Sequence, residues 1–126
     1  MTKKYKHKGG LIMPFIDSKV SCSISKDDEN KLKEQLGKAI ELIPGKSESW
    51  LMLNFEENCK MYFKGDNSNK IAYVEVSIFG SENKAAFEKL TAKICDIFND
   101  ILGISPANIY VKYETTTNWG WNGGNF

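Results

Sequence analysis

Four segments of the chain alternate apolar and polar residues, the pattern typical of β-strands with one buried face. They cover residues 14–21, 49–56, 72–79 and 109–114. In the second segment one face carries Leu51, Leu53 and Phe55, and the other carries Trp50, Met52 and Asn54. The first segment begins at Pro14, a position where a strand tolerates proline. We therefore expect four strands, the first of which starts at a proline.

Two longer segments carry apolar residues at helical spacing. The first stripe consists of Leu32, Leu36, Ile40 and Ile43, and the second of Phe87, Leu90, Ile94, Ile97, Phe98 and Ile101. Ser25 and Ser81 are the expected N-caps of the two helices. Pro44-Gly45 and Gly103 are their expected ends. One helix is thus predicted after the first strand and another after the third.

The two halves of the chain repeat one order of elements. Gly45-Lys46-Ser47 and Gly103-Ile104-Ser105 lie 58 positions apart, and the same shift brings residues 14–21 onto 72–79 and 49–56 onto 107–114. This indicates two βαβ units in tandem, each with a right-handed crossover and parallel strands. The predicted fold is an α/β two-layer sandwich, with two helices on one face of a mixed four-stranded sheet.

Composition and charge exclude several classes of protein. The 126 residues are 41% hydrophobic and 26% charged, which is typical of one folded domain. All 17 basic residues are lysines. Because arginine makes most bidentate contacts to phosphate and guanine, its absence argues against a nucleic-acid partner. No apolar run approaches the roughly 18 residues that a membrane span needs, so we expect no membrane partner either.

The basic residues gather in the first 13 positions, which we call the leader. The leader holds four lysines, the only histidine, His7, and no acidic residue, whereas residues 14–126 carry a net charge of −3. The apolar stretch Leu11–Ile16 is too short, and too interrupted by Pro14, for a secretory signal peptide. We expect a cytoplasmic protein, which could also be released without a signal peptide.

Metal and thiol chemistry have little support in the sequence. Cys22, Cys59 and Cys95 are widely spaced and odd in number, so they indicate neither a disulfide framework nor a thiolate metal site. Apart from His7 in the leader, no histidine is present for a catalytic triad or an imidazole ligand. We expect no metal and no cofactor.

Short motifs follow one another in a fixed order along residues 13–126. They are Met13-Pro14, Gly45-Lys46, Met61-x-Phe63-x-Gly65, Ser77-Ile78, Ile104-Ser105-Pro106 with Ile109-Tyr110, and Asn118-x-Gly120-Trp121-Asn122 with Phe126. In this order and spacing the chain resembles the macrophage migration inhibitory factor (MIF) family of the tautomerase superfamily. The resemblance implies the duplicated βαβ fold and a homotrimer with active sites between subunits.

The resemblance also implies a chemistry for Pro14. In this family the initiator methionine is removed, and the exposed proline is the general base and acid in keto–enol interconversion of substrates such as phenylpyruvate. An ordinary α-amino group has a pKa of about 7.7–8.0. An apolar pocket and a nearby lysine lower that pKa, which leaves a neutral base at physiological pH. The alternative from the residue alone is that Pro14 merely starts an edge strand.

Other residues acquire expected roles only through the resemblance. Lys46 matches the lysine that faces the substrate carboxylate, and Tyr110 the aromatic residue that a neighbouring subunit contributes. The backbone at Ile78 matches a substrate contact. The expected aromatic walls of the pocket are Trp50, Trp121 and Phe126. Simpler alternatives are a solvated lysine, a half-buried strand tyrosine and interface packing of the aromatic residues.

The sequence departs from the family's pattern at several positions. The Cys-x-x-Cys of mammalian members is replaced by Lys70 and Tyr73, which excludes thiol–disulfide exchange through that motif. Lys112 stands where asparagine is frequent, so we expect a second cation near the pocket mouth, favouring anionic substrates. Phe79 stands where glycine is usual, and we expect it to reshape the pocket.

The leader decides between two functions. If residues 1–13 are retained, the Pro14 nitrogen is a planar amide and is not basic. The domain would then be a non-catalytic, cytokine-like interaction protein that binds a protein receptor. If the natural start is Met13, its removal exposes Pro14. We favour this second alternative, because Lys8-Gly9-Gly10 is what a purine-rich ribosome-binding sequence encodes in frame. The expected domain is then 14–126, a tautomerase.

Overall fold

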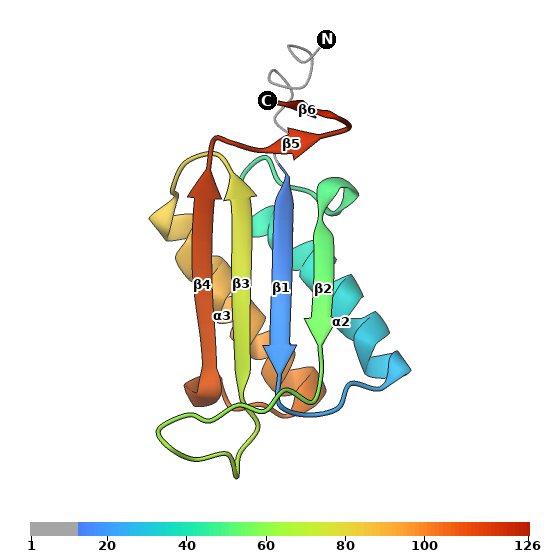
Figure 1. Cartoon of the computed structure of the whole chain (residues 1–126), viewed down its shortest axis with the longest axis vertical. Helices are drawn as coiled ribbons and strands as arrows, with labels where there is room; N and C mark the ends of the chain where they lie inside the picture. The colour runs from blue at the N-terminus through green and yellow to red at the C-terminus, as the bar shows by residue number, and fades with distance from the viewer. Residues whose placement is uncertain (1–12) are drawn as a thin grey trace.

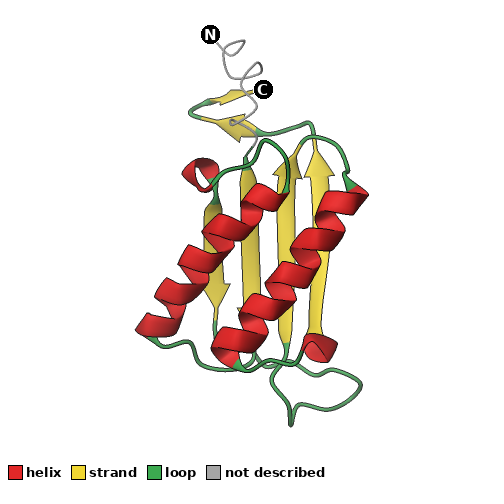
Figure 2. Cartoon of the chain, turned by 180° about the vertical axis from the view of Figure 1, so that it is seen from behind, coloured by secondary structure: helices red, strands yellow, loops and turns green. Residues whose placement is uncertain are grey.

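The computed structural model describes residues 13–126, in which two helices cover one face of a four-stranded sheet (Figures 1 and 2). The strands are β1 (Pro14–Val20), β2 (Met52–Glu56), β3 (Ala72–Phe79) and β4 (Ile109–Thr116). The helices are α2 (Lys26–Ala39) and α3 (Lys84–Leu102), with short 3-10 helices η2 (Ile40–Leu42), η3 (Glu48–Trp50) and η4 (Pro106–Asn108). The predicted two-layer fold is confirmed. The expectation for the leader lies outside the described residues, apart from Met13.

The sheet has the strand order β2-β1-β3-β4. β1 pairs with β2 in parallel, and β3 with β4 in parallel, as expected of two βαβ units. The two units meet through an antiparallel pairing of β1 and β3, in which Pro14 lies opposite Ile78. The two central strands thus run in opposite directions, and Pro14 lies at the end of the sheet where β3 finishes.

The core lies between the sheet and the two helices. Every second residue of β1 and β3 points toward the helices. The apolar stripes predicted for the two helices face the sheet. Fully buried members are Ile16, Val20, Leu32, Leu36, Ile40, Val74, Val76, Ile78, Leu90, Ile94 and Phe98. Among the described residues, every helix, every strand and every core residue other than Met13 lies within 14–126.

Within the described part of the chain, no helix covers the opposite face of the sheet (Figure 1). Its side chains fall into rows that run across all four strands. One row is Met52, Phe15, Ser77 and Glu114, and the next is Asn54, Asp17, Glu75 and Lys112. Ion pairs hold the charged members, with Lys112 near Glu75 and Glu114 and Lys19 near Asp17. Within residues 13–126, neither helix has the length and apolarity to cross a bilayer.

The ends of the helices confirm two of the predicted signals and correct two. The Ser25 side chain accepts a hydrogen bond from the Asp28 N–H, and Gly103 ends α3 with φ +71°. The first helix ends before the expected Pro44-Gly45, since α2 finishes at Ala39 and the 3-10 turn η2 continues only to Leu42. The cap of α3 is Asn83, not Ser81, since the Asn83 side chain accepts from the Ala86 N–H.

Two strand boundaries also differ from the prediction. Residues 48–50 form the 3-10 turn η3, with the Trp50 N–H bonded to the Ser47 carbonyl, so β2 begins at Met52 and not at 49. β4 continues to Thr116, because it stays paired with β3 as far as Phe79. The tail forms a hairpin of β5 (Gly120–Trp121) and β6 (Gly124–Asn125) that the sequence analysis did not predict.

The corrected cap gives a test by two matched substitutions. Asn83→Ala removes the side-chain acceptor of the Ala86 N–H and should lower the free energy of unfolding by roughly 0.5–2 kcal/mol. Ser81→Ala, two residues earlier in the same exposed segment, should lower the free energy of unfolding much less than Asn83→Ala does. Urea denaturation of both variants measures the difference. Equal losses would contradict the assignment of Asn83 as the cap.

Candidate active site

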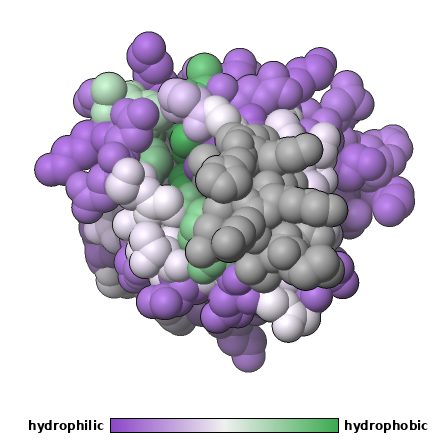
Figure 3. Space-filling view, turned by 90° about the horizontal axis from the view of Figure 1, so that it is seen from above, coloured by the Kyte–Doolittle hydropathy of each residue, from purple (hydrophilic) through white to green (hydrophobic). Residues whose placement is uncertain are grey.

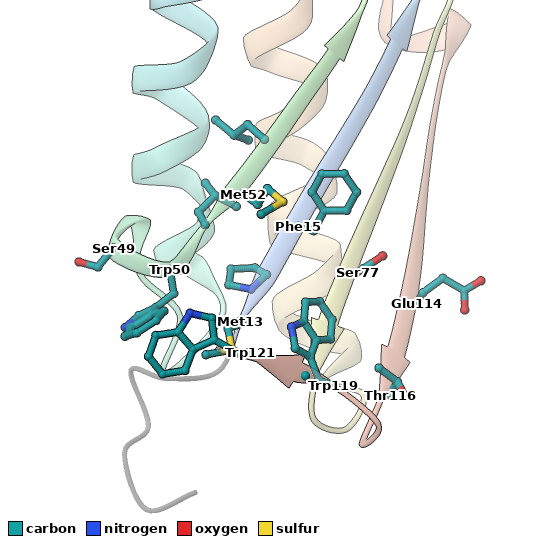
Figure 4. Close-up of a pocket in the computed structure, with 14 residues that line it drawn as sticks. Met13, Phe15, Ser49, Trp50, Met52, Ser77, Glu114, Thr116, Trp119 and Trp121 are labelled. Atoms are coloured by element: carbon teal, nitrogen blue, oxygen red, sulfur yellow. The ribbon is translucent and has the colours of Figure 1, made fainter. Parts of the chain in front are cut away.

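A hollow of about 940 Å³ lies at the end of the sheet where β1 begins. Its floor includes Pro14 and Phe15 of β1 and Met52 of β2, and the C-terminal segment contributes Trp119 and Trp121. Figure 4 shows Trp50 and Trp121 beside Met13, with Trp119 on the side of Ser77 and Glu114. In the view onto this end, hydrophobic residues gather in a central strip bordered by hydrophilic side chains (Figure 3).

The walls of the hollow are aromatic, and two of the predicted aromatic residues form them together. The indole rings of Trp50 and Trp121 meet edge to face, with centroids 4.9 Å apart and an interplanar angle of 88°. Trp50 comes from η3 and Trp121 from β5, so residues 71 positions apart in sequence share one wall. Phe126 packs instead against Phe79, with ring centroids 5.3 Å apart, beside the hollow. Such walls suit a flat, apolar ligand.

Pro14 occupies the first position of β1, and the residue before it is part of the same structure. Met13 is only 4% exposed and lines the hollow. Its carbonyl oxygen accepts a hydrogen bond of 3.3 Å from the Phe79 N–H, which continues the pairing of β1 with β3 by one residue. With Met13 present the Pro14 nitrogen is an amide and has no basic lone pair.

Lys46 lies in the turn between η2 and η3, at the same end of the sheet as Pro14, but it does not line the hollow. Its side chain is buried, with the residue 8% exposed, and burial lowers the pKa of its ammonium group to about 8. Within residues 13–126 no carboxylate pairs with it. A buried cation without a counter-ion favours any anion that can reach it.

Tyr110 and Lys112 lie away from Pro14 within one chain. Tyr110 pairs in register with Tyr73, whereas Ile78, the partner of Pro14, pairs with Thr115. Five strand positions separate the two points along β4, or roughly 16 Å at the usual rise per residue. The tyrosine ring is 63% exposed and stands edge-on to Phe63, with centroids 5.2 Å apart.

Lys112 is surrounded by acids. Its ammonium nitrogen is 3.1 Å from the Glu114 carboxylate and 3.7 Å from that of Glu75. The hydrogen bond that Lys112 donates to Glu114, together with the charges of both acids, raises the pKa of Lys112. Within one subunit its charge is therefore compensated. Glu114 itself lines the hollow.

Several lining residues were not among the predicted site residues. They are Met13, Phe15, Met52, Ser77, Glu114, Thr116 and Trp119. Phe15, Met52, Ser77 and Glu114 form one row across the sheet. The alternation of each strand already assigns them to the face without helices. Their meeting in one row depends on the register of the strands, which alternation alone does not give.

Two βαβ units joined in one mixed sheet are the fold that the resemblance to the tautomerase superfamily implies. No protein-family model and no curated protein sequence matches the chain. Solved structures do. MIF2 from Leishmania major is 31% identical, with a TM-score of 0.84, over 90% of this chain and 97% of that one.

A macrophage migration inhibitory factor homologue from Prochlorococcus marinus is 30% identical, with a TM-score of 0.79, over 89% of this chain and 98% of that one. The chain therefore belongs to the macrophage migration inhibitory factor family. The structure of Pt0534 inactivated by 2-oxo-3-pentynoate shares the fold at 15% identity, with a TM-score of 0.78, over 88% of this chain and 94% of that one.

The burial of Lys46 predicts how stability depends on pH. Its pKa is about 8 in the folded chain, against 10.5 for a free lysine, so between these values the unfolded chain binds more protons. The free energy of unfolding of the wild type should therefore rise with pH, relative to Lys46→Met, from about pH 8 to pH 10. Below pH 8 the variant should be the more stable.

The matched control is Lys112→Met. The pKa of Lys112 is raised, so its contribution to stability is constant below the usual lysine pKa and is lost only at higher pH. Chemical denaturation of the three proteins at pH 7 to 10 gives the comparison. A difference between wild type and Lys46→Met that does not change over this range would show that Lys46 is not desolvated.

Proposed function

We propose that the chain, when Pro14 is its N-terminus, is a keto–enol tautomerase for small aromatic α-keto acids of the phenylpyruvate type. The observation that carries this proposal is the position of Pro14, at the head of β1 and in the floor of an apolar hollow walled by Trp50 and Trp121. The family membership and the shared fold support an isomerase of the tautomerase kind. The substrate and the role of proline are part of the proposal.

In the proposed reaction Pro14 acts first as base and then as acid. Its neutral secondary amine takes a proton from the carbon next to the substrate carbonyl, and the electron pair of that C–H bond moves toward the carbonyl oxygen. The protonated amine then delivers the same proton to that oxygen, which gives the enol. The reverse order gives the ketone. The apolar surroundings of Pro14 disfavour its protonated form, so a neutral base is available near pH 7.

Lys46 is the proposed partner of the substrate carboxylate. Because its pKa is about 8, it is mostly protonated at pH 7, and it has no carboxylate partner among the described residues. A bound carboxylate would satisfy this buried charge. The backbone at Ile78, directly opposite Pro14, is a second proposed contact, and Phe126 a proposed part of the rim.

A homotrimer with active sites between subunits is the proposed assembly. Along β4, Tyr110 lies five positions and Lys112 three positions from Thr115, the residue level with Pro14, and neither lines the hollow of its own chain. The exposed Tyr110 ring and the sheet face without helices leave surface available for a neighbouring copy. In this arrangement Tyr110 and Lys112 of one subunit would complete the site of the next.

A non-catalytic, cytokine-like interaction protein is the second candidate, and one observation favours it for the longer chain. Met13 is buried in the hollow and its carbonyl is bonded to the Phe79 N–H, which is how a chain with residues before Pro14 would be held. An amide at Pro14 cannot act as the base. The protein would then act by binding a receptor.

Enolisation of phenylpyruvate, followed by ultraviolet absorbance, separates the two candidates. The protein 14–126 should be active, and Pro14→Gly in the same background should lose roughly 10²–10⁴-fold in kcat/KM, the usual contribution of a positioned base. The chain 1–126 should be inactive, provided that mass spectrometry finds it unprocessed. Equal activity of Pro14→Gly and its parent would refute the assigned base.

Mixed assemblies test the shared site. Pro14→Gly and Tyr110→Ala, both made in 14–126, should each be poorly active alone. After joint refolding about a quarter of the sites would combine an intact Pro14 from one subunit with an intact Tyr110 from another, so activity should exceed the mean of the two variants. Light scattering should give the mass of three subunits. A mixture no more active than that mean would place Tyr110 outside the site.

A further inference from the structure

At the end of the sheet where β1 begins, one backbone N–H of β3 donates a hydrogen bond to a residue that the proposed enzyme lacks. The Phe79 N–H donates to the Met13 carbonyl at 3.3 Å, next to the buried Met13 side chain. The neighbouring Gly80 N–H is bonded to the Thr116 carbonyl at 2.9 Å, so β4 holds it whether or not Met13 is present. Removal of Met13 therefore leaves the Phe79 N–H without the acceptor that it has here.

The direction of this donor is set by the strand pairing. Pro14 lies opposite Ile78, and the next pair of residues toward the end of the sheet is Met13 with Phe79. The oxygen that Phe79 now holds belongs to the same peptide group as the Pro14 nitrogen, so it lies about 2.2 Å from that nitrogen at standard bond lengths. A substrate oxygen placed nearby, at van der Waals distance from the nitrogen, would still be within hydrogen-bond range of the Phe79 N–H.

We propose that, in the enzyme with a free Pro14, the Phe79 N–H binds the carbonyl oxygen of the substrate and stabilises the enolate that forms when Pro14 removes the neighbouring proton. The inference rests on the proposed function and adds a donor to it. Negative charge grows on that oxygen during proton abstraction, so a fixed N–H aimed at it binds the transition state more tightly than the ketone. The substrate class is any compound with an acidic C–H next to a carbonyl.

Phe79 itself helps to fix this donor. It is the last residue of β3, and Gly80 turns the chain away with φ +130°. The Phe79 ring packs on Phe126 near the C-terminus, which restrains the end of the strand. The Phe79 peptide group therefore stays in the extended conformation of β3, with its ring held by Phe126.

Amide NMR tests the donor without relying on activity. In 1–126, verified as unprocessed, the Phe79 amide should be protected from hydrogen exchange, and in 14–126 it should exchange faster. Added phenylpyruvate should shift the Phe79 amide proton downfield in 14–126 and leave it unchanged in 1–126. The Val76 amide, in the middle of β3 with its side chain buried under the helices, is the internal control and should not respond. If neither the removal of residues 1–13 nor the addition of phenylpyruvate alters the Phe79 amide, the inference is overturned.

An amide-to-ester replacement then measures the contribution to catalysis. Semisynthesis of 14–126 with the α-hydroxy analogue of phenylalanine at position 79 removes only the N–H, and the corresponding amide-to-ester replacement at Val76, in the middle of β3, is the matched control. Loss of one donor to a developing oxyanion typically costs about 10²-fold in kcat. We expect a loss of that order for the ester at 79, with an unchanged pH profile, and little loss for the ester at 76.

The possible results separate the inference from the proposed function. If 14–126 is active and the ester at 79 is as active as the parent, the donor role is wrong and the tautomerase proposal stands. If 14–126 is inactive but phenylpyruvate still shifts the Phe79 amide, the donor binds a carbonyl compound and the catalytic proposal is wrong. Thermal unfolding of both esters identifies any loss that comes from the fold.

Discussion

The pairing of β1 between β2 and β3 is the constraint on which the rest of the structure depends. β1 is a central strand, parallel to β2 on one side and antiparallel to β3 on the other. Proline lacks an N–H and cannot donate to a ladder, so it fits such a strand only at its first residue. The pairing thus places Pro14 at the end of the sheet, and a shift of register by one residue would exchange the buried and open faces of the whole strand.

The bond between residues 13 and 14 controls three properties of the hollow at once. While it is intact, the nitrogen is an amide, the Met13 side chain occupies part of the hollow, and the Met13 carbonyl holds the Phe79 N–H. Cleavage would change all three together, because they are properties of one peptide group and its side chain. Neither Lys46 nor the aromatic walls need move for this, since they come from η3, its preceding turn and the C-terminal hairpin.

The fold was predictable from periodicity, and the site only in part. The repeat of 58 positions gave both βαβ units, because each unit carries its own complete set of apolar stripes and ends. The cap at Asn83 and the turn η3 were missed, since serine and asparagine are equally good caps and an alternating pattern continues through a 3-10 turn. The burial of Lys46 and the row that joins Phe15 to Glu114 depend on tertiary packing and register, which no local pattern contains.

The duplication of the βαβ unit also accounts for the difference between the two ends of the sheet. A shift of 58 carries Pro14 onto Ala72 and Met52 onto Tyr110. Because β1 and β3 are antiparallel, these counterparts lie at opposite ends of the sheet. One end has a proline and a hollow, and the other has an aromatic pair, the exposed Tyr110 and the half-buried Phe63. Two different, complementary ends are what a closed ring of identical subunits requires, since each interface joins unlike surfaces. The proposed trimer thus uses the asymmetry that arose between two copies of one unit.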